Sequence, residues 1–159
     1  MLQSHTKEEA QAELEALGAN GLLDLLHPPQ KHEVDKMAVH RLWKKAKDAA
    51  KERRVTGMEF TLTLEEAREI YRQSGGRCAV SGLSFNETFR VPHSTRRPFK
   101  ASIDRIDSSR GYTKDNVRFV CCIVNLALGD WGDDVLHRVA HAIVLRSKMN
   151  DKGFGAAPA

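Results

Sequence analysis

The most regular pattern of apolar and polar positions lies between residues 101 and 125. An apolar run ends on Asp104, a polar loop that contains glycine follows, and a second β-rich run covers residues 116–120. The apolar segment that comes next carries Asn125. This order predicts strand, loop, strand and helix, with Asp104 at the end of the first strand and Asn125 in the first turns of the helix.

The N-terminal part of the chain is predicted to be helical. Its apolar positions favour a short helix over residues 7–17 and a helical turn over residues 21–26, which Pro28 ends. A long helix with a partial apolar stripe is predicted over residues 33–54. The leucines of the first two segments need burial, either against the rest of the chain, against a partner or against a second copy.

Further elements are predicted upstream of the first pattern. A β-like segment covers residues 59–62, and Thr63 with Glu66 has the spacing of a capping box, which predicts a helix start. That helix should end at Gly75–Gly76. A brief strand is predicted over residues 77–80, and a long irregular loop follows it.

A last helix is predicted to begin at Asp130 or Asp133. Apolar residues in this region are expected to face the core, namely Trp131, Leu136, Val139, Ala140 and Ile143. The chain then divides into an acidic N-terminal helical segment (1–30), a basic helix (31–54), a main domain (55–149) and a disordered tail (150–159).

The two polar residues of the first pattern suggest a chemistry. A carboxylate from Asp104 and an amide oxygen from Asn125 would suit a hard divalent cation such as Mg²⁺ or Mn²⁺. Such a cation stabilises the charge that develops on a phosphodiester during cleavage. One divalent ion is therefore expected at this point of the chain.

Residues 101–125 resemble the core of the HNH endonucleases, which are also called ββα-metal or His-Me finger nucleases. The segment SIDRID, followed by GYTKDNV, is similar to sequences of a phage and prophage branch of that family. The resemblance covers roughly residues 54–146. It implies an α+β fold in which a ββα-metal core, a short antiparallel hairpin plus a helix, is embedded in a mainly helical chain. It also implies that Asp104 and Asn125 bind the metal and that Asn116 braces the loop.

The sequence departs from the family at Arg105, which stands where the family has its general-base histidine. Arginine stays protonated in proteins, so it cannot accept a proton from water, but it can hold a phosphate or transition-state charge. Asp107 and His93 are the candidate substitutes. Two alternatives stay open, namely water activated by the metal without a dedicated side-chain base, and a site that no longer cuts.

The cysteines do not complete a structural zinc site. Cys78 has Ser81 at the position where a second thiolate would stand, and Cys121 has Val124. Since a structural zinc ion needs four ligands, no structural zinc is expected. The thiols are interpreted as small buried residues in a reducing compartment.

Charge distribution points to a polyanionic partner. The net charge is +4, with nine Lys or Arg against four acids in residues 31–54 and eight against three in residues 90–118. Such patches neutralise phosphates. The expected nucleic-acid contacts are Lys44, Lys45, Lys47, Arg53, Arg54, Arg96, Arg97, Lys100, Arg110 and Lys114.

The sequence therefore predicts a metal-dependent HNH-type endonuclease that hydrolyses DNA and is associated with a phage or prophage. Two other functions stay open, namely a catalytically silent nucleic-acid-binding module and an interaction protein that acts through its N-terminal helices. Cutting both strands with a single metal centre would favour a homodimer. No segment reaches membrane-spanning length and no secretory signal is visible, so the cytoplasm of a bacterial host cell is expected, with no membrane partner.

Overall fold

A computed structural model describes residues 36–52, 58–90 and 95–151 of the chain. The helices expected over residues 7–17 and 21–26 lie outside this range, as do residues 152–159 of the expected tail, whereas residues 150 and 151 belong to the last helix. His93 and the two arginines at 53 and 54 are also outside the described residues.

A two-stranded antiparallel hairpin forms the centre of the structure. Strand β1 (Ala101–Arg105) pairs with β2 (Val117–Cys121), so that Asp104 lies opposite Arg118. Helix α5 (Cys122–Leu128) follows β2 directly. The predicted order of strand, loop, strand and helix is thus confirmed, and so is the mixed α+β class.

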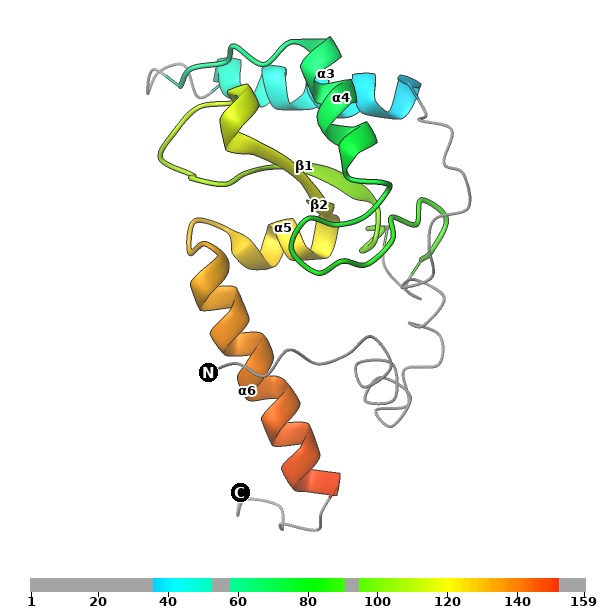
Figure 1. Cartoon of the computed structure of the whole chain (residues 1–159), viewed down its shortest axis with the longest axis vertical. Helices are drawn as coiled ribbons and strands as arrows, with labels where there is room; N and C mark the ends of the chain where they lie inside the picture. Colours follow the sequence, from blue (N-terminus) through cyan, green and yellow to red (C-terminus); the bar gives the residue numbers. More distant parts are fainter. Residues whose placement is uncertain (1–35, 53–57, 91–94, 152–159) are drawn as a thin grey trace.

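Helices cover the two sides of this hairpin. Helix α3 (Lys36–Glu52) and helix α4 (Leu64–Gln73) lie across one side, and α5 lies on the other (Figure 1). The core between them contains Val39, Ala67, Phe119 and other buried apolar side chains. Trp43 of α3 joins it and donates from its indole nitrogen to the Leu62 carbonyl oxygen at 2.8 Å.

The capping box that begins α4 is confirmed. The Thr63 hydroxyl accepts a hydrogen bond from the Glu66 amide at 3.2 Å, and the Glu66 carboxylate accepts one from the Thr63 amide at 2.9 Å. Two glycines with φ of 59° and 76°, Gly75 and Gly76, follow the end of the helix. Because these left-handed angles favour glycine, they explain why the helix stops where the sequence predicted.

The two short strands predicted upstream are wrong in extent. Phe60 forms only an isolated bridge with Tyr112, and Arg77 forms only an isolated bridge with Ser84. Between the last two residues the chain reverses at once, since the Gly82 amide donates to the Cys78 carbonyl oxygen at 2.9 Å. The reversal leaves too few residues to extend the ladder.

The last helix begins at one of the two predicted starts, but its apolar residues lie differently from the prediction. Helix α6 begins at Asp133 and runs to Asp151, packs on α5 and then extends away from the hairpin (Figure 1). Its apolar residues therefore do not face the core, and Val139 and Ile143 are 51% and 63% exposed. Trp131 is 74% exposed as well, because the turn that carries it, flanked by Gly129 and Gly132 with positive φ, directs the chain outward. In the described part of the chain, no helix is both long and apolar enough to cross a membrane.

Candidate functional site

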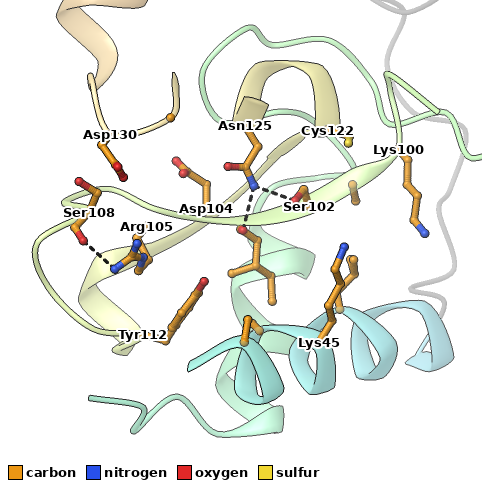
Figure 2. A pocket seen from close by; sticks show the side chains of 16 residues that line it. Lys45, Lys100, Ser102, Asp104, Arg105, Ser108, Tyr112, Cys122, Asn125 and Asp130 are labelled. Atoms are coloured by element: carbon orange, nitrogen blue, oxygen red, sulfur yellow. Dashed lines mark hydrogen bonds between the residues drawn. The ribbon is translucent and has the colours of Figure 1, made fainter. Parts of the chain in front are cut away.

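A hollow of about 510 Å³ lies where α3, β1 and α5 meet. Asp104 enters it from the end of β1, and Asn125 enters it from the second turn of α5 (Figure 2). Lys45 of α3 and Lys100 just before β1 line the same hollow. The fold therefore brings Lys45 of a distant helix together with basic, acidic and amide side chains of residues 100–125.

Asp104 is a buried carboxylate with a strong partner. Its side chain is 7% exposed, and its Oδ2 accepts a hydrogen bond from Nε of Arg118 at 2.8 Å. Burial raises the pKa of the Asp104 carboxyl above its ordinary value, while the hydrogen bond from Arg118 opposes that rise. A positively charged neighbour is what a buried carboxylate requires if it is to stay ionised.

The side-chain amide of Asn125 has a fixed orientation. Its nitrogen donates to the Ser102 hydroxyl at 2.7 Å and to the Ile103 carbonyl oxygen at 3.1 Å. Because both acceptors lie on β1, the amide oxygen is turned to the side where the Asp104 carboxylate lies (Figure 2). The arrangement presents two hard oxygen atoms from two elements of the fold.

Carboxylate and amide oxygens are of the kind that magnesium and manganese ions prefer as ligands. Mg²⁺ is commonly bound by one or two protein oxygens and keeps several water molecules or substrate oxygens. Among the described residues there is no group of three or more His, Cys, Asp and Glu side chains that could hold a metal. A cation bound here would therefore keep most of its coordination positions for water and phosphate.

Asn116 joins the two ends of the loop between β1 and β2. Its amide nitrogen donates to the carbonyl oxygens of Asp107 and Gly111 at 3.0 and 2.8 Å, and its side-chain oxygen accepts from the Asp107 amide at 2.9 Å. The side chain is almost completely buried. These contacts are those of a residue that braces the loop.

Arg105, the residue after Asp104 on β1, also binds this loop. Its Nη1 donates to the carbonyl oxygens of Ser108 and Arg110 at 2.6 and 2.9 Å, and its guanidinium lies 5.3 Å from the centre of the Tyr112 ring. The residue thus holds the loop shape next to Asp104. Its expected role in binding phosphate stays a prediction.

Of the two candidate bases, Asp107 lies in the described part of the chain. Asp107 is exposed and its Oδ1 accepts from the Ser109 hydroxyl and amide at 2.6 and 2.9 Å. These hydrogen bonds hold the pKa of Asp107 below its ordinary value. Asp107 and Asp104 line a second, smaller hollow beside the first. His93 lies outside the described residues.

The lysines predicted on α3 do not share one position. Lys45 lines the hollow and also a second groove along α3, whereas Lys44 lines that second groove alone. Nζ of Lys47 instead lies 4.7 Å from the centre of the Trp43 ring. Only Lys45 of these three therefore lies beside the proposed metal ligands.

The remaining predicted basic residues have varied surroundings. Lys100 lines the hollow, and Arg97 donates to the Glu87 carbonyl oxygen at 3.0 Å. Arg110 forms a 2.5 Å ion pair with Asp115, and the hydrogen bonds from the Thr113 hydroxyl and from Arg110 lower the pKa of that carboxyl to about 2. Lys114 is exposed next to this pair, and nucleic-acid contacts of Arg96 stay a prediction.

Three polar residues of this region were missed in the sequence. Arg118 contacts Asp104, Asp133 contacts Arg118, and Asp130 lines both hollows. The sequence predicts Asp130 and Asp133 only as possible starts of the last helix, not as residues of this site. The pairing of the two strands could have indicated Arg118. Once Arg105 is placed opposite Val117, the next pair outward from the loop is Asp104 with Arg118.

Cys78 and Cys121 come together in the core. Their thiols share a hydrogen bond, which lowers the pKa of Cys78 and raises the pKa of Cys121. The Ser81 amide donates to the Cys78 sulfur at 3.4 Å. The predicted burial of these two thiols is confirmed.

Comparisons with protein-family models, curated proteins and solved structures find no significant match to this chain. A functional interpretation therefore depends on the chain's own residues. Those residues bring together two oxygen ligands and two lysines in one hollow, a combination suited to a divalent cation beside a phosphate group.

Proposed function

We propose that this chain is a metal-dependent endonuclease of the HNH type, which hydrolyses phosphodiester bonds in DNA. In this proposal β1, β2 and α5 form a ββα-metal core. The observation that carries it is the meeting of Asp104 and Asn125 with Lys45 and Lys100 in one hollow. The acidic and amide oxygens would bind a cation, and the lysine ammonium groups beside them would bind the phosphodiester.

Each residue of the hollow has a distinct part in the proposed reaction. Asp104 and Asn125 hold the cation, which when bound supplies Lewis-acid stabilisation to the scissile phosphate. Lys45 and Lys100 bind neighbouring phosphates of the same strand. Arg105 and Asn116 keep the β1–β2 loop in shape beside the reacting group. The phage setting, the bacterial cytoplasm and a homodimer remain expectations from the sequence.

A silent DNA-binding module is the second candidate function. It is favoured by Arg105, which replaces the usual base and uses Nη1 to bind loop carbonyl oxygens. Both functions predict DNA binding, but only the nuclease predicts a metal-dependent chain break. Incubation of supercoiled plasmid with Mg²⁺, with Mn²⁺ and with EDTA separates them. Loss of supercoiled DNA in both metals but not in EDTA supports the nuclease, and intact plasmid with measurable binding supports the silent module.

DNA affinity should depend on Lys45 and Lys100. Each phosphate contact releases counterions, so each of Lys45→Ala and Lys100→Ala should reduce the slope of log affinity against log salt by about 0.9 for duplex DNA. Fluorescence anisotropy across a salt series measures this slope with a labelled duplex and EDTA present.

Lys51→Ala is the matched control for this experiment. It removes the same charge from the same helix, but Lys51 does not line the hollow. We expect its salt slope to stay closer to the wild-type value than that of Lys45→Ala. Wild-type slopes for both Lys45→Ala and Lys100→Ala would assign DNA binding to another surface.

The general base can be identified by substitution together with a pH profile. If Asp107 is the base, Asp107→Asn should lower the cleavage rate by about 10²–10⁴-fold, whereas His93→Ala should have little effect. The pKa of Asp107 is lowered, so its base form persists as pH falls, and protonation of Asp107 should not reduce activity until pH drops below the ordinary value of about 4.

A histidine base would give a different profile. Its base form is lost as pH falls through about 6–7, so the rate should decline there in the wild type and in Asp107→Asn alike. Initial rates of plasmid cleavage between pH 4.5 and about 8.5 distinguish the two candidates. If neither variant slows cleavage by about tenfold, no side-chain base of this kind operates.

A further inference from the structure

Arg118 lies between two aspartates that come from different parts of the fold. Its Nε donates to Oδ2 of Asp104 at 2.8 Å, and its two terminal nitrogens donate to the two carboxylate oxygens of Asp133 at 2.7 and 2.5 Å. The Arg118 side chain is 14% exposed. A guanidinium whose three nitrogens are all engaged has little freedom to rotate.

This arrangement fixes the Asp104 carboxylate. Asp104 and Arg118 face each other across the β1–β2 pair, and Arg118 takes one carboxylate oxygen through a single hydrogen bond. The rotation of the carboxylate is thereby set, and its orientation relative to the Asn125 oxygen is set with it. Ligands of metal ions are commonly held in this way by an outer hydrogen-bonding partner.

The charges of the three side chains oppose one another. Arg118 close to Asp104 would repel a divalent cation, because like charges disfavour each other over short distances. Asp133 offsets that repulsion, because both of its oxygens pair with the same guanidinium. With Asp133 in place, two carboxylates pair with one guanidinium, so the group of three is no longer neutral but carries an excess of negative charge.

We propose that Arg118 is a positioning residue that orients Asp104 for a divalent cation, and that Asp133 strengthens the binding of this cation by holding and neutralising Arg118. The inference rests on the proposed cation site at Asp104 and Asn125. It adds α6 to that site, because Asp133 is the first residue of this helix.

A purely structural role would make a different prediction. The same ion pair joins the start of α6 to β2, so its loss would lower the melting temperature whatever Asp104 does. Only the proposed role also changes the affinity for a metal ion in the folded protein. Metal binding by the folded protein is therefore the deciding measurement.

The test is a titration of the full chain with Mn²⁺, in which electron paramagnetic resonance detects the free ion without DNA. Asp133→Asn keeps the shape of the side chain and leaves Arg118 on Asp104, so the fold should persist. We expect its Kd for Mn²⁺ to rise by about tenfold, the lower end of the effect of outer partners on metal ligands. Asp134→Asn removes the same charge from the same helical turn and should leave Kd within about twofold.

Arg118→Lys tests the orienting role separately. Lysine keeps the charge but lacks the planar fork, so the carboxylate loses its fixed rotation. We expect cleavage at saturating Mn²⁺ to slow by about tenfold or more, while Kd for Mn²⁺ changes less than in Asp133→Asn. A cleavage rate equal to wild type would overturn the positioning role.

The outcomes distinguish this inference from the proposed function. If wild type binds Mn²⁺ and Asp104→Asn does not, the cation site stands, and an unchanged Kd in Asp133→Asn would then overturn the inference alone. If Asp104→Asn binds Mn²⁺ as tightly as wild type, the cation site fails and the inference fails with it.

Discussion

Asp104→Asn is expected to slow magnesium-dependent DNA cleavage by about 10³-fold or more. The substitution removes the charged ligand of the proposed cation, which contributes several kcal/mol of transition-state stabilisation, and about 1.4 kcal/mol corresponds to each tenfold change in rate. Asparagine keeps an oxygen that can accept the hydrogen bond from Arg118, so the variant should remain folded. The measurement is the initial rate of plasmid nicking at saturating Mg²⁺, together with a thermal melt.

Asp115→Asn provides the control for this prediction. Asp115 is also ion-paired with an arginine, but it is exposed and does not line the hollow. The same loss of charge there should change the rate by no more than about threefold, because surface ion pairs contribute little. A rate for Asp104→Asn as high as that of Asp115→Asn would remove Asp104 from the proposed site.

The hairpin and α5 could be predicted because their signals are local. The apolar run before Asp104 and the β-rich run before Asn125 each define one element, and two strands joined by a loop over residues 106–116 pair most simply as an antiparallel hairpin. The start of α4 could be predicted for the same reason, since Thr63 and Glu66 form their reciprocal hydrogen bonds within one helical turn.

The course of the chain after α5 could not be predicted in the same way. Apolar spacing in α6 is typical of a helix that packs on a core, yet the direction of this helix is set by the turn around Gly129 and Gly132. Trp131 sits in that turn and is exposed with it. Periodicity identifies an apolar face, but it does not identify what lies opposite.

The proposed site was predictable residue by residue but not as a network. Spacing brought Asp104 and Asn125 together, and charge density indicated both Lys45 and Lys47. Which lysine lies in the hollow depends on the rotation of α3, with Trp43 packed against the 58–62 segment. The contact of Arg118 with Asp133 depends on tertiary structure as well, since 15 residues separate them.

Asn116→Ala is expected to lower the free energy of unfolding by about 3 kcal/mol. The substitution removes three hydrogen bonds of about 1 kcal/mol each and leaves the Asp107 and Gly111 carbonyl groups and the Asp107 amide without these partners. Chemical denaturation followed by circular dichroism measures the change. Because the loop adjoins Asp104, cleavage should also fall at temperatures where the variant is still folded.

Asn86→Ala is the control that tests whether the expected loss of stability depends on burial of the hydrogen bonds. Asn86 also takes part in three hydrogen bonds, from the Thr88 amide and hydroxyl and the Phe89 amide at 2.8–3.0 Å, but these bonds are exposed to solvent. Water replaces them in the variant, so we expect a loss of about 1 kcal/mol or less. If the two alanine variants lost equal stability, the buried bracing role of Asn116 would be contradicted. If the folded Asn116→Ala protein cleaved DNA at the wild-type rate, the shape of this loop would have no part in the proposed reaction.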